Sequence, residues 1–85
     1  MSPEKLTYMA NQIGTFFRHR PEAQAVADTA DHIKKYWEPR MRNEIVAHFK
    51  AGGAGLDPIP RKAIEWIAGD ARYHHAYPQA VEGEE

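Results

Sequence analysis

Apolar residues recur at intervals of three and four along most of the chain, which is the spacing of one face of an α-helix. A first helix is predicted to begin at Ser2 and Pro3, because serine caps a helix N-terminus and proline suits the first helical position. It is predicted to end before the basic segment 18–20 and Pro21, which break the pattern. The predicted apolar face consists of Leu6, Met9, Ala10, Ile13, Phe16 and Phe17.

Two further helices are predicted, one on each side of Pro39. The second runs from about Glu22 to Trp37 and the third from about Arg40 to Lys50. Because proline disfavours a helical conformation at the residue before it, the chain either breaks or kinks near Glu38, and the sequence permits both. The apolar stripes are Ala23, Val26, Ala27, Ala30, Ile33 and Trp37 in the second helix, and Met41, Ile45 and Phe49 in the third.

Glycine and proline mark the end of the third helix and the start of a fourth. The glycine-rich segment 52–55 follows Lys50, and glycine is the usual residue where a helix ends in a left-handed conformation. Asp57 and Pro58 combine a capping residue with a proline at the first helical position. They predict a short fourth helix that ends at Gly69 and whose apolar residues are Ile59, Ala63, Ile64 and Ile67.

The predicted fold is therefore all-α, a small bundle of three to four short helices over residues 1–69. No segment shows the sustained alternation of a β-strand. Residues 70–85 are acidic and are predicted to form a flexible tail. With 85 residues and no cysteine, the chain can build only a small core, without a disulfide or a thiolate metal site. A partner surface is the expected additional source of stability.

Charge and hydropathy narrow the class of partner. The formal net charge is −1, which gives no electrostatic reason to expect nucleic acid. No apolar run approaches the roughly 18–20 residues of a membrane span, so no membrane association is expected. The absence of cysteine fits a cytoplasmic protein.

Two acid–histidine pairs are candidates for chemistry. Asp28 lies four residues before His32, and Glu44 lies four residues before His48, so each pair could share a helix face. Such pairs can bind a metal inside a helical bundle, but the di-iron proteins use Glu-x-x-His spacing. Two ordinary surface pairs are the favoured interpretation. Nucleophilic catalysis has no support, because the chain has no cysteine and Ser2 is the single serine.

The glycine-rich segment 52–55 has two interpretations. Backbone N–H groups before a helix can hold a phosphate, but the recognised phosphate loops follow a strand or end in Gly-Lys-Ser/Thr. Helix termination followed by a tight turn accounts for these glycines and is favoured.

The segment from Asp31 to Arg42 combines two aromatics, several basic residues and a proline. Tryptophan, tyrosine and arginine are the residue types enriched at the energetic centres of protein interfaces. The alternative is that Trp37 and Met41 belong to the core, with a solvated basic face beside them. If a new helix starts at Pro39, Arg40 and Arg42 lie at its positive dipole end, which is mildly unfavourable unless an acidic group offsets it.

Several of these segments together resemble the delta subunit of NAD-dependent formate dehydrogenases. The segments are Met9–Ile13, Phe16-Phe17, Ala30–Ile33, Tyr36–Arg42 and Gly52–Pro58. The resemblance runs from about Leu6 to Ile67, and the run from Trp37 to Met41 is its most specific part.

The resemblance implies a non-catalytic accessory chain that binds the catalytic subunit and supports its assembly, molybdenum cofactor loading or stability. That complex carries a molybdenum bis-pterin guanine dinucleotide, iron–sulfur clusters and FMN, and no cofactor is expected in this chain. The expected partner-binding residues are Asn11, Gln12, Asp31, His32, Tyr36, Trp37, Arg40 and Arg42.

Two alternatives stay open at this point. One is a small nucleotide- or pterin-binding module that uses the glycine-rich segment with Arg40 and Arg42. The other is a helical domain that associates with itself.

Overall fold

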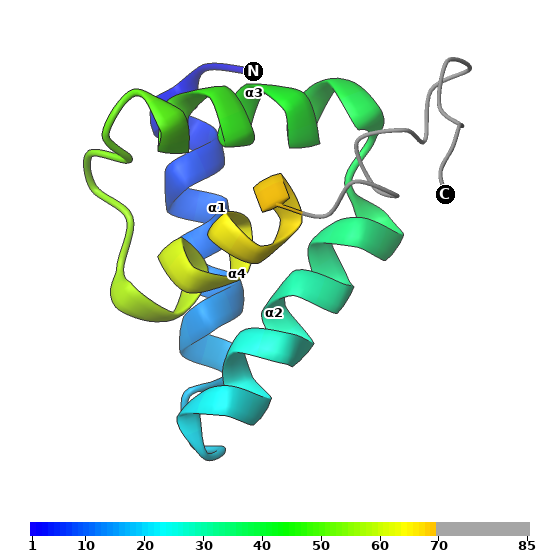
Figure 1. The fold of residues 1–85 in the computed structure, drawn as a ribbon, viewed down its shortest axis with the longest axis vertical. Helices are drawn as coiled ribbons and strands as arrows, with labels where there is room; N and C mark the ends of the chain where they lie inside the picture. Colours follow the sequence, from blue (N-terminus) through cyan, green and yellow to red (C-terminus); the bar gives the residue numbers. More distant parts are fainter. Residues whose placement is uncertain (70–85) are drawn as a thin grey trace.

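Helices form all the regular secondary structure of residues 1–69, the part of the chain that the computed structural model describes (Figure 1). They are α1 (Pro3–Phe17), α2 (Glu22–Tyr36), α3 (Pro39–Lys50) and α4 (Pro58–Gly69). The predicted all-α fold is confirmed, and the predicted tail at 70–85 lies outside the described residues. No helix of residues 1–69 is long and apolar enough to cross a membrane.

Helix α1 begins as its sequence predicts. The Ser2 hydroxyl accepts a hydrogen bond from the Lys5 backbone N–H at 3.1 Å, and Pro3 occupies the first turn. Leu6 and Ala10 are fully buried, as predicted. Phe16 was predicted to share this face, and that prediction is wrong, because its side chain is 71% exposed. At 3.6 residues per turn, a helix that buries Leu6, Ala10 and Gly14 carries Phe16 onto its flank.

The junction between α2 and α3 is a break rather than a kink. Helix α2 ends at Tyr36, one residue before the predicted end, and Trp37 and Glu38 adopt extended backbone with ψ of 139° and 154°. Pro39 then starts α3 in the position where its missing N–H leaves no helical hydrogen bond unmade. Ala23, predicted on the buried stripe of α2, is exposed instead, because the stripe is shifted toward Ala25 and Thr29.

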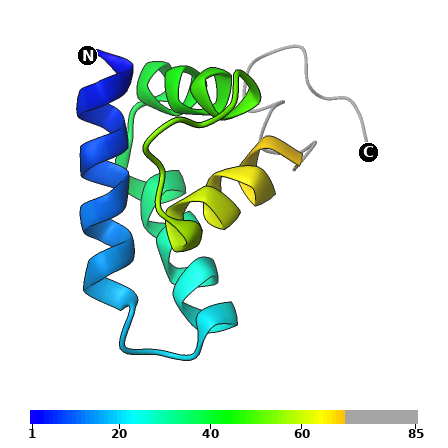
Figure 2. The ribbon, with the colours of Figure 1, turned by 90° about the vertical axis from the view of Figure 1, so that its left-hand side faces the viewer.

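The core lies where α4 packs against all three other helices. Figure 2 shows α1 along one edge of the molecule, with the other three helices all on one side of it. The opposite side of α1 therefore carries no helix of the described chain. The buried core residues are Leu6, Ala10, Ala30, Ile33, Trp37, Ile45, Val46, Leu56, Ala63, Ile64 and Ile67.

Glycine ends α3, as predicted. The N–H groups of Gly52 and Gly53 donate to the carbonyl oxygens of Phe49 and His48 at 3.0 and 2.9 Å, which closes the last turn. Gly52 and Gly53 have φ values of 122° and 65°, a region that other residues rarely adopt. The connection from residue 51 to residue 57, called the glycine loop below, then leads directly into α4.

Candidate functional site

An apolar hollow of about 400 Å³ lies between α1 and the second half of α2. We call it the aromatic groove. Five of its lining residues lie on α1, and across from them lie His32 of α2 and Trp37, the residue that follows α2. The lining residues are Met9, Gln12, Ile13, Phe16, Phe17, His32 and Trp37.

Aromatic rings hold one another in place around this groove. Phe16 and Phe17 pack edge to face with their centroids 5.0 Å apart, and the Arg20 guanidinium lies 5.3 Å from the Phe17 centroid. On the α2 side, the His32 and Tyr36 rings lie 4.8 Å apart. Phe16 and Tyr36 are each 71% exposed, so the groove presents aromatic surface to solvent.

Four of the eight sequence-predicted partner residues gather at the groove. Gln12, His32 and Trp37 line it, and Tyr36 packs on His32. Trp37 is only 5% exposed, so its indole belongs to the core as well as to the groove. The sequence left core and interface as alternatives for this residue, and its position fits both.

Asn11 points away from the groove and holds the glycine loop. Its Nδ2 donates to the Gly55 carbonyl oxygen, and its Oδ1 accepts from the Asp57 backbone N–H, both at 2.9 Å. A single amide side chain thus satisfies one acceptor and one donor of a segment 44 to 46 residues away in sequence.

Arg42 is used within the chain, at the end of α2. Its Nη1 donates to the carbonyl oxygens of Lys34 and Trp37 at 3.1 and 2.8 Å. These carbonyls lie at the negative end of the α2 dipole, where a cation is favourable. The sequence predicted that an acidic group would offset the unfavourable position of Arg42 in the first turn of α3. Carbonyl oxygens at the C-terminal end of α2 take that role instead.

Asp31 and Arg40 are both exposed and lie outside the groove lining. Asp31 pairs with Lys35 one turn later at 3.1 Å, and this hydrogen bond and charge raise the pKa of the Lys35 ammonium. Arg40 lies in the first turn of α3. The structure therefore does not bring all eight predicted residues into one site.

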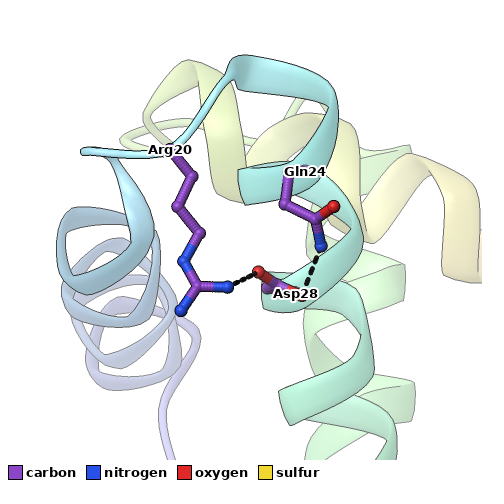
Figure 3. Close-up of polar contacts among 3 residues, drawn as sticks. All are labelled: Arg20, Gln24 and Asp28. Atoms are coloured by element: carbon purple, nitrogen blue, oxygen red, sulfur yellow. Dashed lines mark hydrogen bonds and ion pairs between the residues drawn. The ribbon is translucent and has the colours of Figure 1, made fainter.

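Neither acid–histidine pair forms. Asp28 is taken by Arg20, whose Nη1 donates to Oδ2 at 2.7 Å, and by Gln24, whose Nε2 donates to Oδ1 at 2.9 Å (Figure 3). His48 Nε2 lies 2.8 Å from the Ala54 carbonyl oxygen, so its N–H serves the glycine loop. The prediction of two surface pairs is thus wrong, because Asp28 and His48 each bind another partner. Residues 1–69 hold no group of three metal-ligating side chains.

The glycine loop is bonded to its own chain. Arg61 Nη2 donates to the carbonyl oxygens of Gly52 and Gly53 at 3.1 and 2.9 Å. Arg40 and Arg42 lie in the first turn of α3, whereas the loop follows its last turn. At about 1.5 Å per residue this separates them by roughly 15 Å along the helix. The nucleotide-binding arrangement of the loop with these two arginines is not assembled.

Sequence reasoning missed two residues that shape this region. Tyr8 lies one turn before Gln12, and its hydroxyl accepts a hydrogen bond from Gln12 Nε2 at 3.1 Å. Arg61 follows the glycine loop, and its partners are backbone oxygens. The spacing of four between Tyr8 and Gln12 was a usable signal, but no side-chain pattern predicts which cation binds a carbonyl.

Fold and site together define a small all-α protein with an exposed aromatic groove on the edge helix. A model of the family described as the NADH-dependent formate dehydrogenase delta subunit, FdsD, matches residues 5–64. The chain belongs to this family, which confirms the resemblance drawn from the sequence. Comparisons with curated proteins and with solved structures gave no match. The matched residues include both walls of the aromatic groove and the glycine loop.

Proposed function

We propose that this chain is a non-catalytic accessory subunit that docks through the aromatic groove on the catalytic subunit of a formate dehydrogenase. In this proposal it acts in the cytoplasm and supports assembly, molybdenum cofactor loading or stability of the catalytic subunit, and it holds no cofactor itself. The family assignment supports a place in a formate dehydrogenase complex. The observation that carries the docking surface is the cluster of exposed aromatic rings around one groove.

The groove has the properties that favour binding of a partner helix. Its walls are two helices, and such a groove accepts the apolar face of a third. Trp37, one of its lining residues, is held in place by the core, so this side chain loses little conformational freedom on binding. Phe16 is 71% exposed, and burying its apolar ring against a partner supplies binding energy.

The eight predicted residues then divide by role. Gln12, His32, Tyr36 and Trp37 are proposed to contact the partner. Asn11 and Arg42 position the elements around them through backbone hydrogen bonds. Asp31 and Arg40 are exposed, and in the proposal they contribute polar contacts outside the groove.

Phe16→Ser tests the proposal in cells that express the formate dehydrogenase subunits and lack the wild-type chain. Burial of a phenylalanine is worth about 1.5–3 kcal/mol, so we expect the variant to bind the catalytic subunit ~10- to 100-fold more weakly. The variant should stay folded, because the Phe16 side chain is mostly exposed. Recovery of the chain with the purified catalytic subunit and the molybdenum content of that subunit are the measurements.

Lys50→Ser is the matched control, because it removes a long exposed side chain from α3 outside the groove. It should co-purify as the wild type does. Equal recovery of Phe16→Ser and wild type, with both folded, would show that the groove is not the docking surface. Unchanged molybdenum content and stability of a catalytic subunit made without the chain would remove the accessory role.

A further inference from the structure

A second hollow lies on the other flank of α2, between α2 and α4, with a volume of about 430 Å³. Trp66 forms one side of it and is 53% exposed. Small side chains of α2, among them Ala23 and Ala27, form the other side. This hollow, called the Trp66 face below, shares no lining residue with the aromatic groove.

The core does not account for Trp66. Helix α4 buries Pro60, Ala63, Ile64 and Ile67, all on the side that faces the other helices. Trp66 lies on the flank of the helix, where a smaller or polar residue would leave that packing intact. Trp66 also lies after residue 64, where the family match ends, so an inference from this residue is independent of the family assignment.

One lysine ammonium lies near the indole, and a second lysine, Lys62, lines the hollow. The Lys34 ammonium lies 5.2 Å from the centre of the Trp66 ring, a cation–π contact. Lys62, one turn before Trp66, pairs with Glu22 at 2.6 Å, and Lys35 pairs with Asp31 at 3.1 Å. Within residues 1–69, Lys34 has no carboxylate partner at ion-pair distance. The Trp66 face therefore combines apolar surface with one uncompensated positive charge.

We infer that the Trp66 face binds a segment of a second protein surface that carries an apolar side chain next to a carboxylate. The apolar side chain packs on the indole and the alanines of α2, and the carboxylate pairs with Lys34. Tryptophan is one of the residue types enriched at interface centres, and the charge complementarity selects an acidic occupant over a basic one. This inference rests on the proposed function in one respect, namely that the chain is part of a formate dehydrogenase complex. With the aromatic groove on one protein surface and the Trp66 face on another, the chain would bridge the two surfaces.

Zero-length coupling with a carbodiimide tests this directly. The reagent joins an amine to a carboxylate in contact with it, forming an amide with loss of water to the reagent. It is applied to the purified formate dehydrogenase complex that contains the full chain. We expect Lys34 to be linked to an aspartate or glutamate of another subunit. Lys35–Asp31 and Lys62–Glu22 links within the chain serve as internal controls, since both pairs are within 3.1 Å.

A charge reversal gives a second measurement. Lys34→Glu should lower the affinity of the chain for the complex about fivefold or more, and the loss should shrink at high salt. Lys5→Glu is the matched control, because it reverses the charge of an exposed lysine of α1 that lines neither hollow, and it should bind as the wild type does.

The outcomes separate the two proposals. If the complex contains the chain and both control links form but Lys34 stays unlinked, the inference about the Trp66 face is wrong and the proposed function stands. The same holds if Lys34 is linked only to residues 70–85 of its own chain. A chain that does not co-purify with the complex overturns the proposed function and this inference together.

Discussion

Gly14 sets the distance between α1 and α4. A Cβ atom built on Gly14 would lie 2.7 Å from Pro60 Cδ, closer than real Cβ contacts. Pro60 is fully buried, and its Cδ belongs to a ring that cannot rotate away. Glycine inside a helix costs about 0.5–1 kcal/mol relative to alanine. The close packing of the two helices on a small core compensates for that cost.

Gly14→Ala should therefore destabilise the chain despite the better helix propensity of alanine. Overpacking of a tight contact costs typically about 1–3 kcal/mol, and we expect a net loss of that order in the free energy of unfolding. Urea unfolding followed by circular dichroism measures it. Gly69→Ala is the matched control, because a Cβ there meets nothing within 4 Å. A Gly14→Ala protein as stable as the Gly69→Ala protein would contradict the close approach of α1 and α4.

Single residues also show where sequence reasoning stops. The cap at Ser2 was predictable, because its hydrogen bond joins residues three apart. The exposure of Phe16 was not, because its apolar character and spacing suit a buried face. The packing of α2, α3 and α4 against α1 decides which side of it is covered. The partners of Arg42 were likewise not predictable from the sequence, because they are backbone carbonyl oxygens.

Side chains from three helices hold the glycine loop. Asn11 of α1 binds Gly55 and Asp57, His48 of α3 lies against the Ala54 carbonyl oxygen, and Arg61 of α4 binds the first two glycines. The Arg61 guanidinium also lies 6.0 Å from the Phe49 ring centre. Glycines alone would leave this loop conformationally free, but these hydrogen bonds fix it. The fixed loop connects α1 to α3 and α4.

Asn11→Ala should loosen this connection. It removes a donor and an acceptor, and leaves two backbone groups without their partner, so we expect a loss of about 1–3 kcal/mol in the free energy of unfolding. Gln12→Ala is the control on the next residue, where only the hydrogen bond to Tyr8 is lost and the change should stay within about 0.5 kcal/mol. If thermal and urea unfolding give equal values for the two variants, Asn11 has no such structural role.

At the level of elements, the sequence was informative wherever the signal was local. Caps, prolines and glycines predicted the start of α1, the end of α3 and the start of α4. The junction at Pro39 could not be decided, because proline tolerates a break and a kink alike. The break is supported by Arg42, which binds the freed carbonyl oxygens at the end of α2. That interaction depends on tertiary geometry.

On the scale of the whole molecule, α2 lies between two hollows with different properties. The aromatic groove on the α1 side is lined by large rings, and the Trp66 face on the α4 side combines an indole with lysine charge. Periodicity predicts that a helix has a buried stripe, but not which flanks stay uncovered after packing. Half of the eight partner residues that the sequence named therefore lie at the groove, and the exposed ring of Phe16, which also lines it, was not among those eight.

The most direct test of the account is a hydroxyl-radical footprint of the chain, free and bound to the catalytic subunit. Side chains that solvent reaches are oxidised, and mass spectrometry reports each site. Docking through the aromatic groove predicts that Phe16 and Tyr36, each 71% exposed in the free chain, become protected on binding. Phe49 of α3, outside the groove, should react equally in both states. Equal oxidation of Phe16 and Tyr36 in the free and bound chain would contradict the proposed docking surface.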